Sequence, residues 1–266
     1  MAGCFTSSSR GKTLNTPSDP AAIGLTVQKA RDAGLLVITL DTPLDPIDSA
    51  DATFATDNRL AGKLIGQWAA AKLGDEAQNA KVAMLDFSNA QISVDYLRNQ
   101  GFMEGFGFDV GDPNRWGDEN DPRICGHFMT GANEEGGRTG MEQALQKCPD
   151  VNVVYTINEP TAAGASEALR ALGKDDGFVL VLSIDGGCDG VAMLNDVTAN
   201  ATSMQFPDRM ASMAMQALKT FAETGEKPVV TPGLEFTNTG TELFTNDPQD
   251  GIPSEDAAAG LKKCWG

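Results

Sequence analysis

The chain has 266 residues, 41% of them hydrophobic and 21% charged, which excludes a disordered chain, a collagen and a disulfide-dominated mini-protein. The length allows one large domain or two small ones. Lys and Arg number 20 against 37 Asp and Glu, and a net charge of −17 repels nucleic-acid phosphates, so we expect no nucleic-acid partner. No stretch approaches the roughly 20 apolar residues of a membrane-spanning helix, which excludes that class of protein as well.

From residue 18 onward, amphipathic helices alternate with short apolar strands. We expect a first helix that begins near Ser18 and Asp19 and ends at Gly34, followed directly by a strand. The later predicted helices span 57–74, 93–106, 134–147, 160–172 and 207–223. The predicted strands span 35–40, 52–57, 82–85, 124–129, 151–157, 178–184 and 200–205. This alternation predicts an α/β fold with parallel sheets covered on both faces.

Less regular segments interrupt and close this pattern. Residues 109–123 are polar and contain Pro and Gly, so we expect a surface loop and assign no chemistry to it. Two short strands are predicted near the C-terminus, LEF at 234–236 and ELFT at 242–245. The last segment, SEDAAAGLKKCWG, is predicted to be a closing helix.

Polar residues stand directly after three of the predicted strands. They are Asp41 after LLVITL, Asn158 after VVYTI, and Asp185 at the end of VLVLSID. Ligands of open parallel sheets gather at the carboxyl ends of the strands, so these side chains are predicted to converge there on a neutral, hydroxyl-rich ligand. The alternative is that each one caps a helix or forms a turn.

Arg98 and Gln205 are two further candidates. Arg98 lies in the predicted helix 93–106 and offers a rigid set of donors, while Gln205 ends a strand and both donates and accepts. An arginine on a helix is by default a solvated surface group, so residue type alone does not assign Arg98 to a site.

Enzyme and metal signatures are missing from the sequence. The segment from Thr6 to Thr13 ends like a phosphate-binding loop, but it lacks the first glycine and Pro17 blocks the helix that should follow. His127 is the only histidine and lies within a predicted strand, so we interpret it as structural. We therefore expect no catalytic residue, no metal and no cofactor.

The five cysteines form no CxxC pair, which excludes a zinc ribbon and a thioredoxin motif. In an oxidising compartment they allow the pairs Cys188 with Cys264 and Cys125 with Cys148, and they leave Cys4 over. In a reducing compartment they are small buried apolar residues.

An ordered series of motifs runs through residues 16–266. It comprises TPSD, KARDAGLLVITLDTP, ATFATDN, LRNQGFMEGFG, VVYTINEPTAAGA, SIDGGCDGV and ATSMQFP. The series strongly resembles the ribose-type periplasmic sugar-binding proteins of ABC importers, and it is most similar to fructose-binding members, whose chains also close on CWG.

The resemblance implies a type I periplasmic binding protein fold, with two doubly wound lobes joined by three crossovers. It places the N-terminal lobe at 1–57 and 206–238, and the C-terminal lobe at 58–204 and 239–266. It also implies that a monosaccharide, fructose-like or ribose-like, is held in the cleft between the lobes. The sugar-binding residues carried over from the family are Asp41, Arg98, Asn158, Asp185 and Gln205.

The family begins with a signal peptide and two strand-helix units that have no counterpart in residues 1–15, so we expect an N-terminally truncated chain with an incomplete N-terminal lobe. The resemblance implies a monomeric, non-enzymatic solute-binding protein of the periplasm, with the membrane subunits of an importer as partners. Two alternatives are the sugar-sensing domain of a regulator and an enzyme on the same scaffold.

Overall fold

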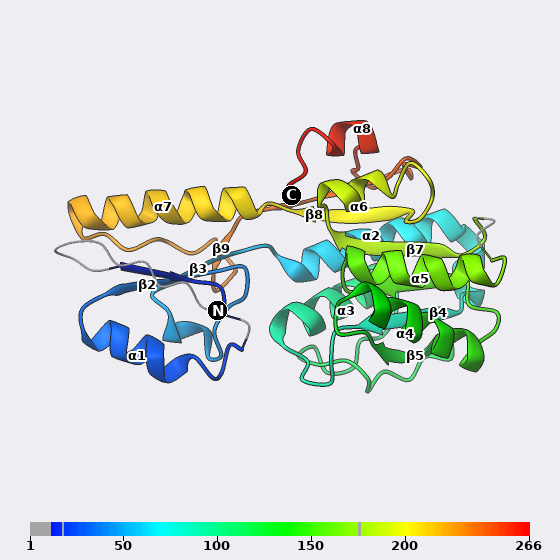
Figure 1. Ribbon diagram of the computed structural model, residues 1–266, viewed down its shortest axis with the longest axis horizontal. Helices are drawn as coiled ribbons and strands as arrows, with labels where there is room; N and C mark the ends of the chain where they lie inside the picture. Colours follow the sequence, from blue (N-terminus) through cyan, green and yellow to red (C-terminus); the bar gives the residue numbers. More distant parts are fainter. Residues whose placement is uncertain (1–11, 18, 175–176) are drawn as a thin grey trace. The chain divides into compact units, whose positions relative to one another are not determined.

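The computed structural model describes residues 12–17, 19–174 and 177–266. These residues form two compact units (Figure 1): unit 1 comprises residues up to 57 and 206–240, and unit 2 comprises 58–205 and 241–266. The chain therefore passes between the units three times. These bounds differ from the expected lobe bounds by at most two residues. Cys4 and most of the segment from Thr6 to Thr13 lie outside the described residues.

Unit 1 has a parallel sheet of four strands in the order β1-β2-β3-β9. The strands are β1 (Lys12–Asn15), β2 (Leu36–Leu40), β3 (Ala52–Ala55) and β9 (Thr237–Asn238). The helices α1 (Gly24–Asp32) and α7 (Pro207–Thr224) lie on opposite sides of this sheet (Figure 1). Alternation along β2 explains this, because Leu36 and Ile38 pack with α7 residues whereas Val37 packs with Val27 of α1.

Three local features of unit 1 differ from what the sequence analysis expected. Strand β1 was not predicted, since its sequence KTLN has a single apolar residue, and its register is set by parallel pairing with β2. The segment LEF forms no strand, because the chain turns there, with Gly233 at a φ of 86° and the N–H of Thr231 bonded to the carbonyl of Phe236. Helix α1 begins only at Gly24, and Asp19 caps the preceding turn by accepting from the N–H of Ala22 at 2.9 Å.

Unit 2 has a sheet of six strands in the order β10-β8-β7-β6-β4-β5, in which only β10 runs antiparallel to its neighbour. The strands are β4 (Val82–Asp86), β5 (Ile124–Met129), β6 (Val153–Thr156), β7 (Leu180–Asp185), β8 (Ala201–Gln205) and β10 (Thr241–Phe244). The principal helices are α2 (Asn58–Leu73), α3 (Ser93–Phe106), α4 (Glu134–Lys147) and α5 (Glu159–Ala171). The α/β fold class with parallel-sheet lobes is therefore confirmed.

Two apolar layers cover the sheet of unit 2. Val82 and Met84 of β4 pack in the layer that contains α2 and α3, whereas Ala83 and Leu85 pack in the layer that contains α4 and α5. Strands buried on both faces read as continuous apolar runs, which is why VAML and LVLSI were recognisable in the sequence.

Two disulfides join distant parts of unit 2. One links Cys125 of β5 to Cys148 after α4, and the other links Cys188 to Cys264, whose Cα atoms are 4.9 Å apart. Cys188 begins α6 (Cys188–Ala192), a helix of five residues that the sequence did not predict because it is shorter than two turns. The closing helix is also shorter than expected, because α8 spans only Ala257–Gly260.

Helices α2 and α3 touch backbone to backbone through glycines. A Cβ atom on Gly62 would lie 2.0 Å from the carbonyl oxygen of Arg98, and one on Gly101 would lie 2.0 Å from that of Arg59. No side chain larger than hydrogen fits at either position. This contact fixes where α3 lies on the sheet, and with it the position of Arg98.

Replacing Gly62 with Ala should therefore push α3 away from α2. We expect the free energy of unfolding to fall by about 1 to 3 kcal/mol, measured by urea denaturation, because inserted volume strains a packed contact. Gly24→Ala is the control, since nothing lies within 4 Å of a Cβ there, and it should change stability by less than about 1 kcal/mol. Equal effects of the two substitutions would contradict the steric argument.

Candidate functional site

Three of the predicted residues meet at the carboxyl edge of the unit 2 sheet. Asp185 ends β7 and Gln205 ends the neighbouring strand β8, and the Oδ1 atom of Asp185 accepts from Gln205 Nε2 at 2.9 Å. Arg98 reaches the same oxygen from α3, with Nη1 at 3.0 Å. The three side chains form one network, in which Arg98 and Gln205 are buried and Asp185 is partly exposed, and which we call the Asp185 cluster.

Arg98 is buried, with 6% of its surface exposed, so it is not the solvated helix residue that its type suggests. Its Nε donates to Oδ1 of Asn58 and its Nη1 to the carbonyl oxygen of Ile157, both at 2.8 Å. A buried guanidinium is tolerated when its N–H groups have acceptors of this kind, and the contacts hold its plane in one orientation.

Gln205 supplies an acceptor that the fold does not use. Its Oε1 atom is buried and has no hydrogen-bond partner among the described residues, although its Nε2 is bonded to Asp185. Burying an oxygen without a hydrogen-bond donor costs about 1 to 3 kcal/mol of folding free energy. Gln205 Oε1 is therefore suited to accept a hydrogen bond from a ligand hydroxyl. The Asp185 cluster thus combines acceptors with the guanidinium donor, as a polyhydroxylated molecule requires.

Asn158 has a structural role as well. Its Oδ1 accepts from the N–H and the hydroxyl of Thr161, which makes it the N-cap of α5, and its Nδ2 donates to the carbonyl of Ala132 at 3.0 Å. Asn158 therefore caps a helix in the structure, which is the alternative that the sequence analysis left open. A contact between Asn158 and a ligand stays a prediction.

Asp41 does not share a sheet edge with Asn158 and Asp185. It follows β2 of unit 1, whereas the other two end strands of unit 2, so the expectation that all three gather on one edge was wrong. Asp41 has a φ of 66°, and its Oδ2 accepts from the hydroxyl of Thr42 at 3.1 Å.

Asn15, a residue that the sequence analysis missed, lies at the same edge of the unit 1 sheet as Asp41. It ends β1, the parallel neighbour of β2, and its Nδ2 is buried with no hydrogen-bond partner in the part of the chain that is described. The signal that could have found it is its place before TPSD, but without a predicted strand there it was not read as a strand end.

His127, which the sequence analysis interpreted as structural, is held between two carboxylates. Its Nδ1 lies 2.7 Å from Oδ2 of Asp86, its Nε2 bonds to Oε1 of Glu119, and its ring stacks on Trp116 with centroids 4.6 Å apart. Burial opposes charge on the imidazole, but these two hydrogen bonds prevail and raise its pKa to about 9. The 109–123 loop, to which no chemistry was assigned, is thus anchored by the ion pair between its Glu119 and His127 of β5.

Asp95 fixes the loop between β4 and α3. Its two oxygens accept from the backbone N–H groups of Phe87 and Ser88 at 3.0 and 3.3 Å. Burial, and then the charge of Asp86, raise the pKa of Asp95 to about 7. Because Arg98 follows one turn later on α3, this contact also helps to hold the Asp185 cluster.

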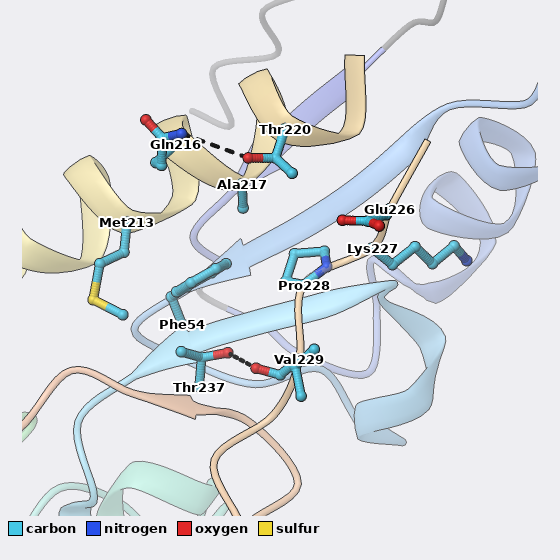
Figure 2. A pocket seen from close by; sticks show the side chains of 10 residues that line it. All are labelled: Phe54, Met213, Gln216, Ala217, Thr220, Glu226, Lys227, Pro228, Val229 and Thr237. Atoms are coloured by element: carbon cyan, nitrogen blue, oxygen red, sulfur yellow. Dashed lines mark hydrogen bonds between the residues drawn. The ribbon is translucent and has the colours of Figure 1, made fainter. Parts of the chain in front are cut away.

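A surface pocket of about 330 Å³ lies in unit 1, between α7 and the strand β3 (Figure 2). Its lining is largely apolar, with Phe54, Met213, Ala217 and Val229, and Lys227 stands at its side. None of the predicted binding residues lines it, and the hydrogen bonds drawn in Figure 2 run between lining residues. We assign it no ligand.

The described ranges contain no group of three His, Cys, Asp or Glu residues arranged to hold a metal ion. Over the same ranges, no helix is both long enough and apolar enough to cross a membrane.

Comparison with protein families places the chain in one of them. Residues 15–227 match the family described as periplasmic binding protein domain. The chain belongs to this family, whose fold is the one described above. It is 31% identical over 210 residues to the ribose import binding protein of Escherichia coli (strain K12), a match that covers 76% of this chain and 62% of the relative.

A second relative and a solved structure show the same similarity to periplasmic binding proteins. The ribose import binding protein of Bacillus subtilis (strain 168) is 29% identical over 77% of this chain and 60% of its own length. The chain thus spans about three fifths of the length of these ribose-binding relatives. The crystal structure of a galactofuranose binding protein superimposes with a TM-score of 0.76 at 25% identity, over 94% of this chain and 77% of that one.

The contacts of His127 predict a pH-dependent stability. Because its folded pKa of about 9 exceeds the value of 6.5 outside the fold, its contribution is complete below pH 6.5 and is lost as pH rises through 9. The difference in unfolding free energy between the wild type and His127→Gln should shrink by on the order of 3 kcal/mol across that range. Urea denaturation of both proteins at each pH measures it, and a constant difference would contradict a charged His127.

Proposed function

We propose that this protein binds a neutral monosaccharide, that the Asp185 cluster supplies its principal polar contacts, and that the sugar is delivered to an ABC importer without chemical change. The observation that carries the proposal is the network of Arg98, Asp185 and Gln205, in which Gln205 Oε1 lacks a donor. A sugar hydroxyl satisfies that oxygen and is itself matched by the carboxylate and the guanidinium.

Two relatives and one protein of similar fold support a sugar as the ligand. The matched proteins from Escherichia coli and Bacillus subtilis are named as ribose import binding proteins, and an Agrobacterium vitis solute binding protein of similar fold was solved with bound D-fucose. We propose a pentose or a ketohexose, fructose-like or ribose-like, with the protein acting as a monomer in the periplasm. A contact between the sugar and Asp41 stays a prediction.

Isothermal titration calorimetry of the purified chain against D-ribose, D-fructose, D-allose and D-galactose tests the proposal. Asp185→Ala should weaken binding by about 1 to 3 kcal/mol, or roughly tenfold or more, because a sugar hydroxyl and Arg98 both lose their acceptor. Gln205→Ala should weaken binding in the same direction.

The matched control is Glu142→Ala, which removes a carboxylate paired with Arg138 on the exposed part of α4 and should leave sugar affinity unchanged. Sugar analysis after overnight incubation adds a second readout, and recovery of the unaltered sugar is expected. If a panel sugar is hydrolysed or modified, the protein is an enzyme and the proposal fails. If Asp185→Ala binds as well as the wild type, the assignment of the site fails.

A further inference from the structure

Glu159 is a buried carboxylate beside the Asp185 cluster, and nothing in the proposed binding of a sugar uses it. It is the first residue of α5 and lies directly after Asn158, with 6% of its surface exposed. Burial, followed by the nearby charge of Asp185, raises the pKa of Glu159 to about 8. Burying an ionisable group costs folding free energy, so its presence in the interior calls for a structural or functional reason.

The hydrogen bonds of the Glu159 carboxylate are with residues close to Asp185 in space. Its Oε1 accepts from the backbone N–H of Gly186 at 2.8 Å and from the hydroxyl of Thr202 at 3.0 Å, and its Oε2 accepts from the N–H of Gly187 at 3.0 Å. Gly186 and Gly187 immediately follow Asp185, so the carboxylate clamps the two peptide groups that set the direction of the Asp185 side chain.

The loop after β7 is shaped around this carboxylate. A Cβ atom on Gly190 would lie 1.8 Å from Cδ of Glu159, and one on Gly186, at a φ of 70°, would lie 2.3 Å from Cβ of Met204. Asp185 itself has a φ of 131°, a backbone conformation that persists only where its surroundings enforce it. In the motif SIDGGCDG, the close approach of Glu159 therefore requires glycine at position 190, whereas Gly186 is required by its positive φ and by Met204.

The C-terminal segment holds the same loop by other atoms. Trp265 Nε1 donates to the carbonyl oxygen of Asp185 at 3.1 Å, and the N–H of Cys188 donates to the carbonyl of Trp265 at 3.0 Å. The disulfide between Cys188 and Cys264 fixes this segment to the loop. Glu159 thus accepts hydrogen bonds from the N–H groups that follow Asp185, while Trp265 donates a hydrogen bond to the carbonyl oxygen of Asp185.

We propose that Glu159 is a positioning residue that holds Asp185 in its orientation toward Arg98 and Gln205, and that it thereby sets the sugar affinity of the Asp185 cluster. This proposal rests on the binding function proposed above. Glu159 does not touch the sugar, so its effect on affinity passes entirely through Asp185.

A double-mutant cycle separates positioning from general support of the fold. At pH 9, above the pKa of about 8 at which Glu159 ionises, Glu159→Gln keeps the size of the side chain but turns one acceptor into a donor that faces a backbone N–H. We expect it to weaken binding of the preferred panel sugar at least tenfold in calorimetry. In the Asp185→Ala background the same substitution should change affinity by less than about twofold, because its target is gone.

Ser166→Ala is the matched control. Ser166 lies two turns further along α5, and its buried hydroxyl donates to the carbonyl of Thr198 at 2.5 Å, so its loss disturbs the same helix away from the site. Its affinity should equal that of the wild type. Where Glu159→Gln does not fold, Thr202→Val removes only one donor to the carboxylate and should weaken binding by a smaller factor.

Wild-type affinity in Glu159→Gln, or a full additional loss in the Asp185→Ala background, would overturn the proposal. A crystal structure of Glu159→Gln decides the matter without a ligand. If the wild type binds no panel sugar, the binding function fails, while positioning is still judged by the 3.0 Å distance between Asp185 Oδ1 and Arg98 Nη1. That distance should lengthen in the variant, and an unchanged distance would refute positioning.

Discussion

A buried guanidinium requires acceptors for its N–H groups, and this requirement organises unit 2 around Arg98. The acceptors come from Asn58 at the start of α2, from the carbonyl of Ile157 after β6, and from Asp185 at the end of β7. A single side chain on α3 therefore ties together a helix and two strand ends that are far apart in the sequence. Displacing α3 would leave a charge without partners in the interior, which costs several kcal/mol.

The glycine contact between α2 and α3 provides the close packing that these hydrogen bonds and the ion pair of Arg98 require. Arg98 reaches Asn58 and the strand ends because the carbonyl of Arg98 can lie against Gly62 without an intervening side chain. Polar residues therefore occupy the buried part of α3 without loss of close packing, and Asp95, Arg98, Asn99 and Gln100 are each at most 6% exposed. The helix that carries the candidate binding arginine is positioned by the glycine contact and by hydrogen bonds, in addition to the apolar burial of Phe102, Met103 and Phe106.

These features explain which parts of the protein the sequence could predict. Helices 93–106 and 134–147 were predicted to the residue, because Gly107 ends the first in a left-handed conformation and Asn133 caps the second. The strand end at Asp185 followed from an apolar run, and the strand end at Gln205 was predicted just before the helix that begins at Pro207. The burial of Arg98, the ion pairs of His127 and the contacts of Glu159 were not predictable, because each depends on a partner at least 8 residues away, and most partners lie more than 25 away.

Two of the buried carboxylates of unit 2 share one arrangement. Asp95 and Glu159 both stand in the first turn of a helix and turn back to accept N–H groups of a loop that follows a strand. Each replaces the water that loop amides would otherwise bind, so buried side chains order the loops at the carboxyl edge of the sheet. In a chain of net charge −17, most carboxylates keep the protein hydrated, whereas these two are withdrawn from water to order the edge at which a sugar is proposed to bind.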